Sequence, residues 1–163
     1  MSLGIGARII NHYTGFKKRQ IVSYLRASFK ALLYKSPSQI VDLEIDNFKK
    51  TLDPLVLFVS NSNEMGYNLS LTPKASLQDG KLDVVFTEQL SFVEKILFAS
   101  QLIFNKHKRY KKANYFLTDN IKVTNKKQKE FLTQLDGESI IIKSKELNIS
   151  IKKGALNVLV PKS

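Results

Sequence analysis

From Asn114 onward, short apolar segments alternate with turn signals at close intervals. The turn signals are Asp119-Asn120, Asp136-Gly137 and Lys153-Gly154, and residue pairs of this kind typically connect antiparallel strands. The segments that we expect to form strands are Tyr115 to Leu117, Ile121 to Thr124, Phe131 to Leu135, Ser139 to Ile142, Leu147 to Ile151 and Leu156 to Val160. Such a density of short strands predicts a mainly β fold, a two-sheet antiparallel β-sandwich, with a barrel as the nearest alternative.

The first part of the chain adds three more predicted strands. Ile40 to Ile45 alternates apolar and polar residues, whereas Leu55 to Ser60 is a continuous apolar run typical of a strand buried on both faces. Leu82 to Phe86 follows the Asp79-Gly80 turn signal. These strands are consistent with the sandwich predicted from the later part of the chain.

Two amphipathic helices are expected to flank the sheets. Apolar residues recur at helical spacing over Phe16 to Tyr34, which stops at Ser36-Pro37-Ser38. The second predicted helix runs from Ser91 to Phe104. Ser91 and Glu94 have the spacing of a capping box, in which each side chain accepts a hydrogen bond from the other residue's backbone amide.

Length and composition indicate one folded domain over residues 1–163. The chain is 43% hydrophobic and contains ten Phe, enough for a real core. It contains no Cys, which excludes disulfides, thiolate metal sites and a Cys nucleophile. No signal peptide opens the sequence, and no apolar run approaches the roughly 18 residues of a membrane span. We therefore expect a cytoplasmic protein.

Positive charge dominates the sequence and is unevenly distributed. The net charge is +12, from 26 basic and 14 acidic residues. The basic residues that precede Asp42, the first acid, are Arg8, Lys17, Lys18, Arg19, Arg26, Lys30 and Lys35. A second basic cluster contains Lys106, Lys108, Arg109, Lys111 and Lys112. Such surfaces attract anionic lipid headgroups, nucleic acids or phosphorylated substrates, although solvated helix faces and helix-dipole compensation are simpler alternatives.

Two turns carry the acids with the clearest chemical use. Asp136 and Glu138 flank a glycine, and a carboxylate there could take a proton from a hydroxyl or help to hold a divalent cation. Asp79 and Asp83 flank Gly80-Lys81-Leu82 at a second turn, where one carboxylate and backbone carbonyls would suit Mg²⁺. From spacing alone a plain hairpin is favoured at both turns. The two His residues, His12 and His107, have no metal-type spacing, and no phosphate-binding glycine loop is present.

Six segments, in order, resemble the second domain of diacylglycerol and sphingoid lipid kinases. No single segment is specific, but together they cover nearly the whole chain. They are Gly4-Ile5-Gly6-Ala7, Phe58 to Asn61, Gly66 to Pro73, Asp79 to Val84, Asp136-Gly137-Glu138 and Leu156 to Pro161.

The resemblance implies a fold, a reaction and roles for particular residues. The fold is a β-sandwich like the second domain of NAD kinases and bacterial lipid kinases. The family's nucleotide-binding domain carries a Gly-Gly-Asp-Gly-Thr motif and is the main binding site for ATP. This domain is absent from this sequence. Glu138 would be the base that activates a lipid hydroxyl, with Asp136 in support. A structural Mg²⁺ would use the Asp79 side chain and the carbonyls of Ser76 and Lys81.

We therefore expect the C-terminal, lipid-substrate domain of an ATP-dependent lipid kinase that phosphorylates a hydroxyl of diacylglycerol or a sphingoid base. Its expected partners are the lipid, the missing nucleotide-binding domain and an anionic membrane surface, contacted through Lys17, Lys18, Arg19 and Arg26. Alone, the domain is expected to be inactive and peripheral to the membrane. The alternatives are the second domain of an NAD kinase-like enzyme, and a non-enzymatic basic module for membranes or nucleic acid, for which Tyr110 and Tyr115 beside the second basic cluster are suitable aromatics.

Overall fold

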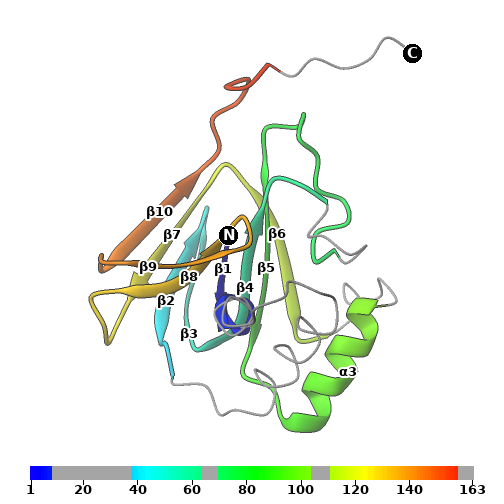
Figure 1. The fold of residues 1–163 in the computed structure, drawn as a ribbon, viewed down its shortest axis with the longest axis vertical. Coiled ribbons are helices and arrows are strands. Elements are labelled where there is room, and N and C mark those ends of the chain that lie inside the picture. The colour runs from blue at the N-terminus through cyan, green and yellow to red at the C-terminus, as the bar shows by residue number, and fades with distance from the viewer. Residues whose placement is uncertain (9–37, 64–69, 104–110, 158–163) are drawn as a thin grey trace, which may run out of the picture.

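The computed structural model describes residues 1–8, 38–63, 70–103 and 111–157. Its strands form two antiparallel sheets that pack face to face, which confirms the predicted two-sheet sandwich (Figure 1). The six-stranded sheet has the order β6-β5-β4-β1-β8-β9 and the four-stranded sheet the order β10-β7-β2-β3.

The elements have the following bounds. The six-stranded sheet contains β1 (Ser2–Gly4), β4 (Pro54–Ser60), β5 (Leu82–Glu88), β6 (Ala113–Thr118), β8 (Phe131–Leu135) and β9 (Glu138–Ile142). The four-stranded sheet contains β2 (Val41–Ile45), β3 (Phe48–Leu52), β7 (Asn120–Asn125) and β10 (Glu146–Ser150). Helix α3 spans Phe92–Ile103, and residues 5–8 form a helical turn directly after β1.

The main core lies between the two sheets. Alternate residues of β2 point inward and are buried, as the alternating sequence of this segment predicts. Three aromatic rings join the sheets at one place: Phe48 of β3 lies 5.9 Å from Phe86 and 4.8 Å from Phe116, measured between ring centroids. Phe86 and Phe131 are fully buried in this core. Burial of this apolar surface is the main force that holds the sheets together.

A second core covers the other face of the six-stranded sheet. Leu55, Val56 and Phe58 of β4 pack there against Phe98 of α3. Strands β4 and β5 are consequently buried on both faces along almost their whole length. This double burial explains why the Leu55 to Ser60 segment is continuously apolar instead of alternating.

The four-stranded sheet differs, because its outer face carries paired charges. Glu44 of β2 lies opposite Lys49 of β3 and Lys122 of β7. The Lys49 ammonium is 2.8 Å from the Glu44 carboxylate, and the Lys122 ammonium is 3.0 Å from that of Glu146 on β10. Lys126, at the end of the same face, pairs with Asp42 at 2.9 Å. Opposite charges on neighbouring strands suit a sheet face that contacts solvent.

The capping box predicted at the start of α3 is confirmed. The Ser91 backbone amide donates to Glu94 Oε2 at 2.8 Å, and the Glu94 amide donates to Ser91 Oγ at 3.4 Å. The Glu94 carboxylate also pairs with the Lys112 ammonium. These contacts to Lys112 and Ser91 lower the pKa of Glu94 to about 2.

The sequence prediction differs from the structure in three places. Strands β1 and β3 were not predicted, because β1 is short and β3 has three exposed residues in its middle. The strand predicted from Leu156 to Val160 does not form at Leu156 and Asn157, which are exposed. Residues 158–160 of that segment, and the helix predicted over Phe16 to Tyr34, lie outside the described residues.

Gly4 closes β1 in a conformation that requires glycine. Its φ is +77°, and a Cβ at this position would lie 2.3 Å from the carbonyl oxygen of Leu55 on β4. Only a residue without a side chain allows the two backbones to approach so closely. The first glycine of the Gly-Ile-Gly-Ala segment thus sets the contact between β1 and β4.

Candidate functional site

Strand direction brings the two acid-bearing turns to the same end of the six-stranded sheet. Ser2 pairs antiparallel with Phe58 of β4 and with Gln134 of β8, so β4 and β8 run in the same direction. Strand β4 ends there at Ser60, and β5 begins there at Leu82 after the Asp79 turn. The turn after β8 therefore lies at the same end as the β4–β5 connection.

The Asp136-Gly137 turn is a two-residue hairpin. Leu135 pairs with Glu138, and both turn residues have positive φ, 45° for Asp136 and 87° for Gly137. Two consecutive positive φ angles are the condition for a type I′ turn, which matches the twist of the strands. The pairing places the Glu138 side chain on the same face of the hairpin as Leu135, and Asp136 and Glu138 are both exposed. The hairpin interpretation is correct, and the two carboxylates are presented at its tip.

The hairpin tip lies close to the end of β4. The Met1 ammonium donates to the Val59 carbonyl at 2.8 Å, and the Val59 amide donates to the Met1 carbonyl at 2.9 Å. Burial lowers the pKa of this ammonium, while the charge of Asp136 acts in the opposite direction. Asp136 is therefore near enough to influence a group that is bonded one residue before Ser60.

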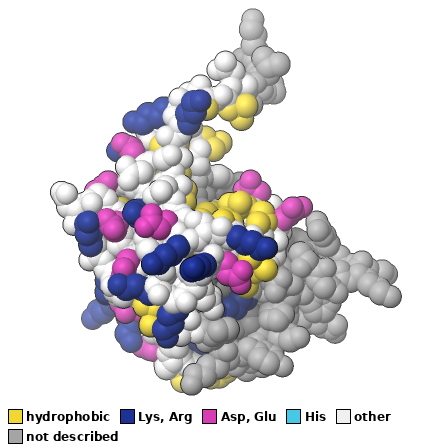
Figure 2. Space-filling model, turned by 90° about the vertical axis from the view of Figure 1, so that its left-hand side faces the viewer, with side chains coloured by type: hydrophobic (Ala, Val, Ile, Leu, Met, Phe, Trp, Pro, Cys, Tyr) yellow, Lys and Arg dark blue, Asp and Glu magenta, His cyan; other side chains and the backbone are white. Residues whose placement is uncertain are grey.

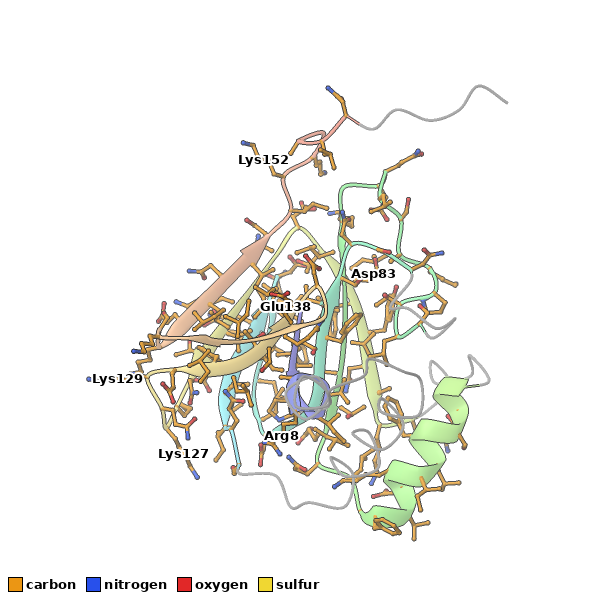
Figure 3. All side chains as sticks on the ribbon, in the orientation of Figure 1. Arg8, Asp83, Lys127, Lys129, Glu138 and Lys152 are labelled. Carbon is orange, nitrogen blue, oxygen red and sulfur yellow. The ribbon has the colours of Figure 1, made fainter. Side chains whose placement is uncertain are left out.

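Asp83, which was predicted together with Asp79 to flank the turn, is a buried acid at this same end. It pairs in register with Ser60 of β4 and Leu117 of β6, and it has no solvent exposure. Figure 3 shows Asp83 and Glu138 toward the same end of the molecule. A fully buried carboxylate has a large desolvation cost, so it is uncommon outside functional or tightly paired positions. The available signal was an Asp within the otherwise apolar strand Leu-Asp-Val-Val-Phe.

Hydroxyl groups hold the connection between β4 and β5 in place. Ser60 Oγ donates to the Ser62 carbonyl at 2.7 Å, and Thr72 Oγ1 donates to the same carbonyl at 3.0 Å. The Thr72 amide donates to Ser70 Oγ at 3.2 Å. These bonds join the segment after β4 to the segment that leads toward Asp79, and they satisfy the buried hydroxyl of Thr72.

The Asp79 turn contains the residues predicted for a cation. The Lys81 amide donates to Asp79 Oδ1 at 2.8 Å, so one carboxylate oxygen closes the turn. The Lys81 ammonium is 2.8 Å from Asp119, and this bond raises the pKa of Lys81. The Lys153 side chain lies against Gly80, and the Gln78 amide donates to Ser76 Oγ at 3.2 Å.

A cation at this turn would have few charged ligands. The described part of the chain contains no group of three or more His, Cys, Asp or Glu side chains arranged around a common point. Asp79 would supply the only carboxylate, and the carbonyls of Ser76 and Lys81 would be its companions. Mg²⁺ retains several waters at sites with so few charged ligands.

The predicted membrane-facing residues, Lys17, Lys18, Arg19 and Arg26, lie outside the described residues. Within the described residues, no helix has the length and apolar character needed to cross a membrane. Tyr115 of β6 is half-buried, and Lys111 and Lys112 next to it in the sequence are exposed.

Comparison with known proteins agrees with the fold. Residues 1–160 match the family described as the YegS C-terminal NAD kinase beta sandwich-like domain. A candidate diacylglycerol kinase from Bacillus anthracis strain Sterne has a similar structure, with a TM-score of 0.64 at 13% identity over 91% of this chain and 48% of that one. A diacylglycerol kinase from the same strain gives a TM-score of 0.62 at 15% identity, over 94% of this chain and 48% of that one. The chain thus spans about half the length of these structures. No curated protein sequence matches it.

Proposed function

The chain belongs to the family of YegS C-terminal NAD kinase β-sandwich-like domains, which are found in lipid kinases, and we propose that it binds the lipid substrate of an ATP-dependent kinase. The parent enzyme would transfer the γ-phosphoryl group of ATP to a hydroxyl of diacylglycerol or a sphingoid base. The observation that carries the proposal is that the Asp136-Gly137-Glu138 tip, the Asp79 turn and buried Asp83 lie at the same end of one sheet. We propose that a nucleotide-binding domain presents ATP at this end.

In the proposed reaction, Glu138 is the general base. As the lipid oxygen attacks the γ-phosphorus, its proton passes to the Glu138 carboxylate, and the bond between the γ-phosphorus and the leaving oxygen of ADP breaks. Exposure of Glu138 at a hairpin tip suits this role, because the carboxylate must reach a substrate held between two domains. Asp136, on the same turn, would support it through its charge or through the metal that accompanies the phosphates.

We further propose that the Asp79 turn holds a structural Mg²⁺ loosely, with the carbonyls of Ser76 and Lys81. The support is the turn itself, which already directs the Asp79 carboxylate to the backbone. NMR titration with Mg²⁺ should shift the Asp79 and Lys81 signals at millimolar concentration, and Asp79→Ala should remove the response. Equal shifts in the wild type and Asp79→Ala would exclude this site.

Phosphoryl transfer by the protein in which this chain is joined to its nucleotide-binding domain tests the proposal. With γ-labelled ATP, we expect label in diacylglycerol or a sphingoid base presented in mixed micelles. Label in NAD alone would favour the NAD kinase-like alternative. Label in none of these acceptors, from protein that binds ATP, would contradict the proposal and favour a non-enzymatic basic module.

A further inference from the structure

The outer face of helix α3 is apolar and exposed. The exposed fractions are 52% for Phe92, 64% for Val93, 50% for Ile96 and 50% for Leu97. At 100° per residue these four side chains fall within one arc of the helix surface, and Phe98, which is 6% exposed, lies on the opposite side. Figure 1 shows α3 at the periphery of the fold, to the right of β6. Phe98 anchors the helix while the apolar arc faces outward.

The one polar side chain in the middle of this arc is already satisfied. Ser100 lies between the positions of Ile96 and Val93 around the helix, and its hydroxyl donates to the Leu97 carbonyl at 2.7 Å. A hydroxyl that is bonded within its own helix loses little when water is removed from it. The arc can therefore enter an apolar environment without leaving this donor unpaired.

The acids near the arc are paired with lysines, and further lysines lie close to it in the sequence. The acid of the helix, Glu94, is paired with Lys112, and Glu88, just before the helix, is paired with Lys50. Lys95 and the exposed Lys111 complete the surroundings. The flanks of the apolar arc are thus basic or neutralised, within a chain of net charge +12.

We infer that α3 is an interfacial membrane helix, whose apolar arc of Phe92, Val93, Ile96 and Leu97 enters an anionic bilayer while the neighbouring lysines contact lipid phosphates. Helices that lie in a membrane surface combine an apolar face with basic flanks in this way. A second copy of the chain is the weaker occupant. A stable interface needs about 800 Å² from each partner, whereas this arc is less than about two helical turns long. The basic flanks of two copies would also repel each other.

This inference deepens the proposed function, because a kinase acting on a membrane lipid must reach the bilayer, but its test reads binding and not catalysis. The protein is mixed with phosphatidylcholine vesicles that contain either no phosphatidylglycerol or roughly 30% of this anionic lipid. The test variant is Val93→Ser combined with Ile96→Ser. Leu117→Ser on β6 is the matched control, since Leu117 is 53% exposed and lies outside α3.

For the wild type and the control we expect co-sedimentation with the anionic vesicles. The double variant should partition at least about tenfold less, since two large apolar side chains no longer leave water. Far-UV circular dichroism of all three proteins controls for folding. Equal partition of the wild type and the folded double variant, or an equal loss in Leu117→Ser, would overturn the inference.

A single tryptophan gives a second readout, because the sequence contains none. In Val93→Trp, addition of anionic vesicles should shift the emission to the blue, and brominated lipids should quench it. Unshifted emission from protein that sediments with the vesicles would place the membrane contact elsewhere and overturn the inference. The inference would also be overturned if the wild type were a dimer, and the double variant became a monomer with unchanged vesicle binding.

Lipid phosphorylation without insertion of α3 would contradict this inference alone. Insertion of α3 without lipid phosphorylation would contradict only the proposed function.

Discussion

The two sheets of the sandwich share one core but meet different surroundings on their other faces. The outer face of the four-stranded sheet contacts solvent with a ladder of paired charges, including Lys49 with Glu44 and Lys122 with Glu146. Basic and acidic side chains accordingly alternate over the side of the molecule seen in Figure 2. In the six-stranded sheet, β4 and β5 are buried on both faces, and the Asp79 and Asp136 turns lie at one end of its strands.

This difference distinguishes charged side chains that pair with one another across strands from charged side chains at the end of a sheet, where a substrate could reach them. Glu44 faces a lysine on each neighbouring strand, and contact with Lys49 lowers its pKa. Glu138 is on a hairpin tip at the end of the sheet that also carries buried Asp83. We therefore expect substitutions in the ladder to have mild effects, whereas substitutions in the six-stranded sheet should affect stability or activity strongly.

The largest stability effect is expected at the core shared by both sheets. Phe86→Ala removes a fully buried ring that contacts Phe48 and Phe116. Loss of this ring and the resulting cavity should lower the free energy of unfolding by about 3–5 kcal/mol. Urea denaturation followed by circular dichroism measures the change. A loss below about 1 kcal/mol would mean that the sheets are not held together at this point.

Gly4→Ala tests the close contact of β1 and β4 in the six-stranded sheet. The new methyl group would meet the Leu55 carbonyl at 2.3 Å, in a backbone conformation with φ of +77°. Strain of this kind costs about 1–3 kcal/mol per residue. Gly137→Ala is the control, because no atom lies within 4 Å of the added methyl group at that positive φ. An equal loss in both variants would show that φ alone, and not the strand contact, requires Gly4.

The smallest expected effect concerns the cap of α3. Ser91→Ala removes the acceptor for the Glu94 amide and should cost about 1 kcal/mol of stability, measured by urea denaturation at pH 7.

The same cap predicts a pH dependence. The folded-state pKa of Glu94, about 2, lies below its ordinary 4.5, so its contribution is present above pH 4.5 and is lost as pH falls from 4.5 toward 2. Glu94→Gln should therefore have a lower free energy of unfolding than the wild type at pH 7, and the two values should converge near pH 2. A difference of constant size over this range would contradict the assignment.

Local chemistry made much of the fold predictable. Alternation identified β2, continuous apolarity identified β4, and the Ser91 and Glu94 spacing identified the start of α3. Strand β1 escaped prediction because three residues carry too little pattern, and its place between β4 and β8 depends on contacts far away in sequence. Exposed β3 escaped because its polar residues face solvent at the edge of a sheet.

The site was predictable only in pieces. Turn chemistry indicated the Asp136-Gly137 hairpin and the Asp79 turn, but not that strand order would bring them to one end of the six-stranded sheet. Burial of Asp83 also depends on neighbours from β4 and β6, which no local pattern reveals. Helix α3 was predicted to be amphipathic and to flank the sheets, but not to leave Phe92 and Ile96 half-exposed.

The central claim is that the charge at the end of the six-stranded sheet is catalytic and the charge on the ladder is structural. The most direct measurement compares kcat for lipid phosphorylation in Glu138→Gln and Glu44→Gln, made in the proposed two-domain kinase. Both variants replace a surface carboxylate with an amide of the same shape. We predict that Glu138→Gln loses about 10²–10⁴-fold in kcat with ATP affinity unchanged, whereas Glu44→Gln stays close to wild type. Near wild-type turnover by Glu138→Gln would contradict the account and show that the Asp136-Gly137 turn is a hairpin without a catalytic role.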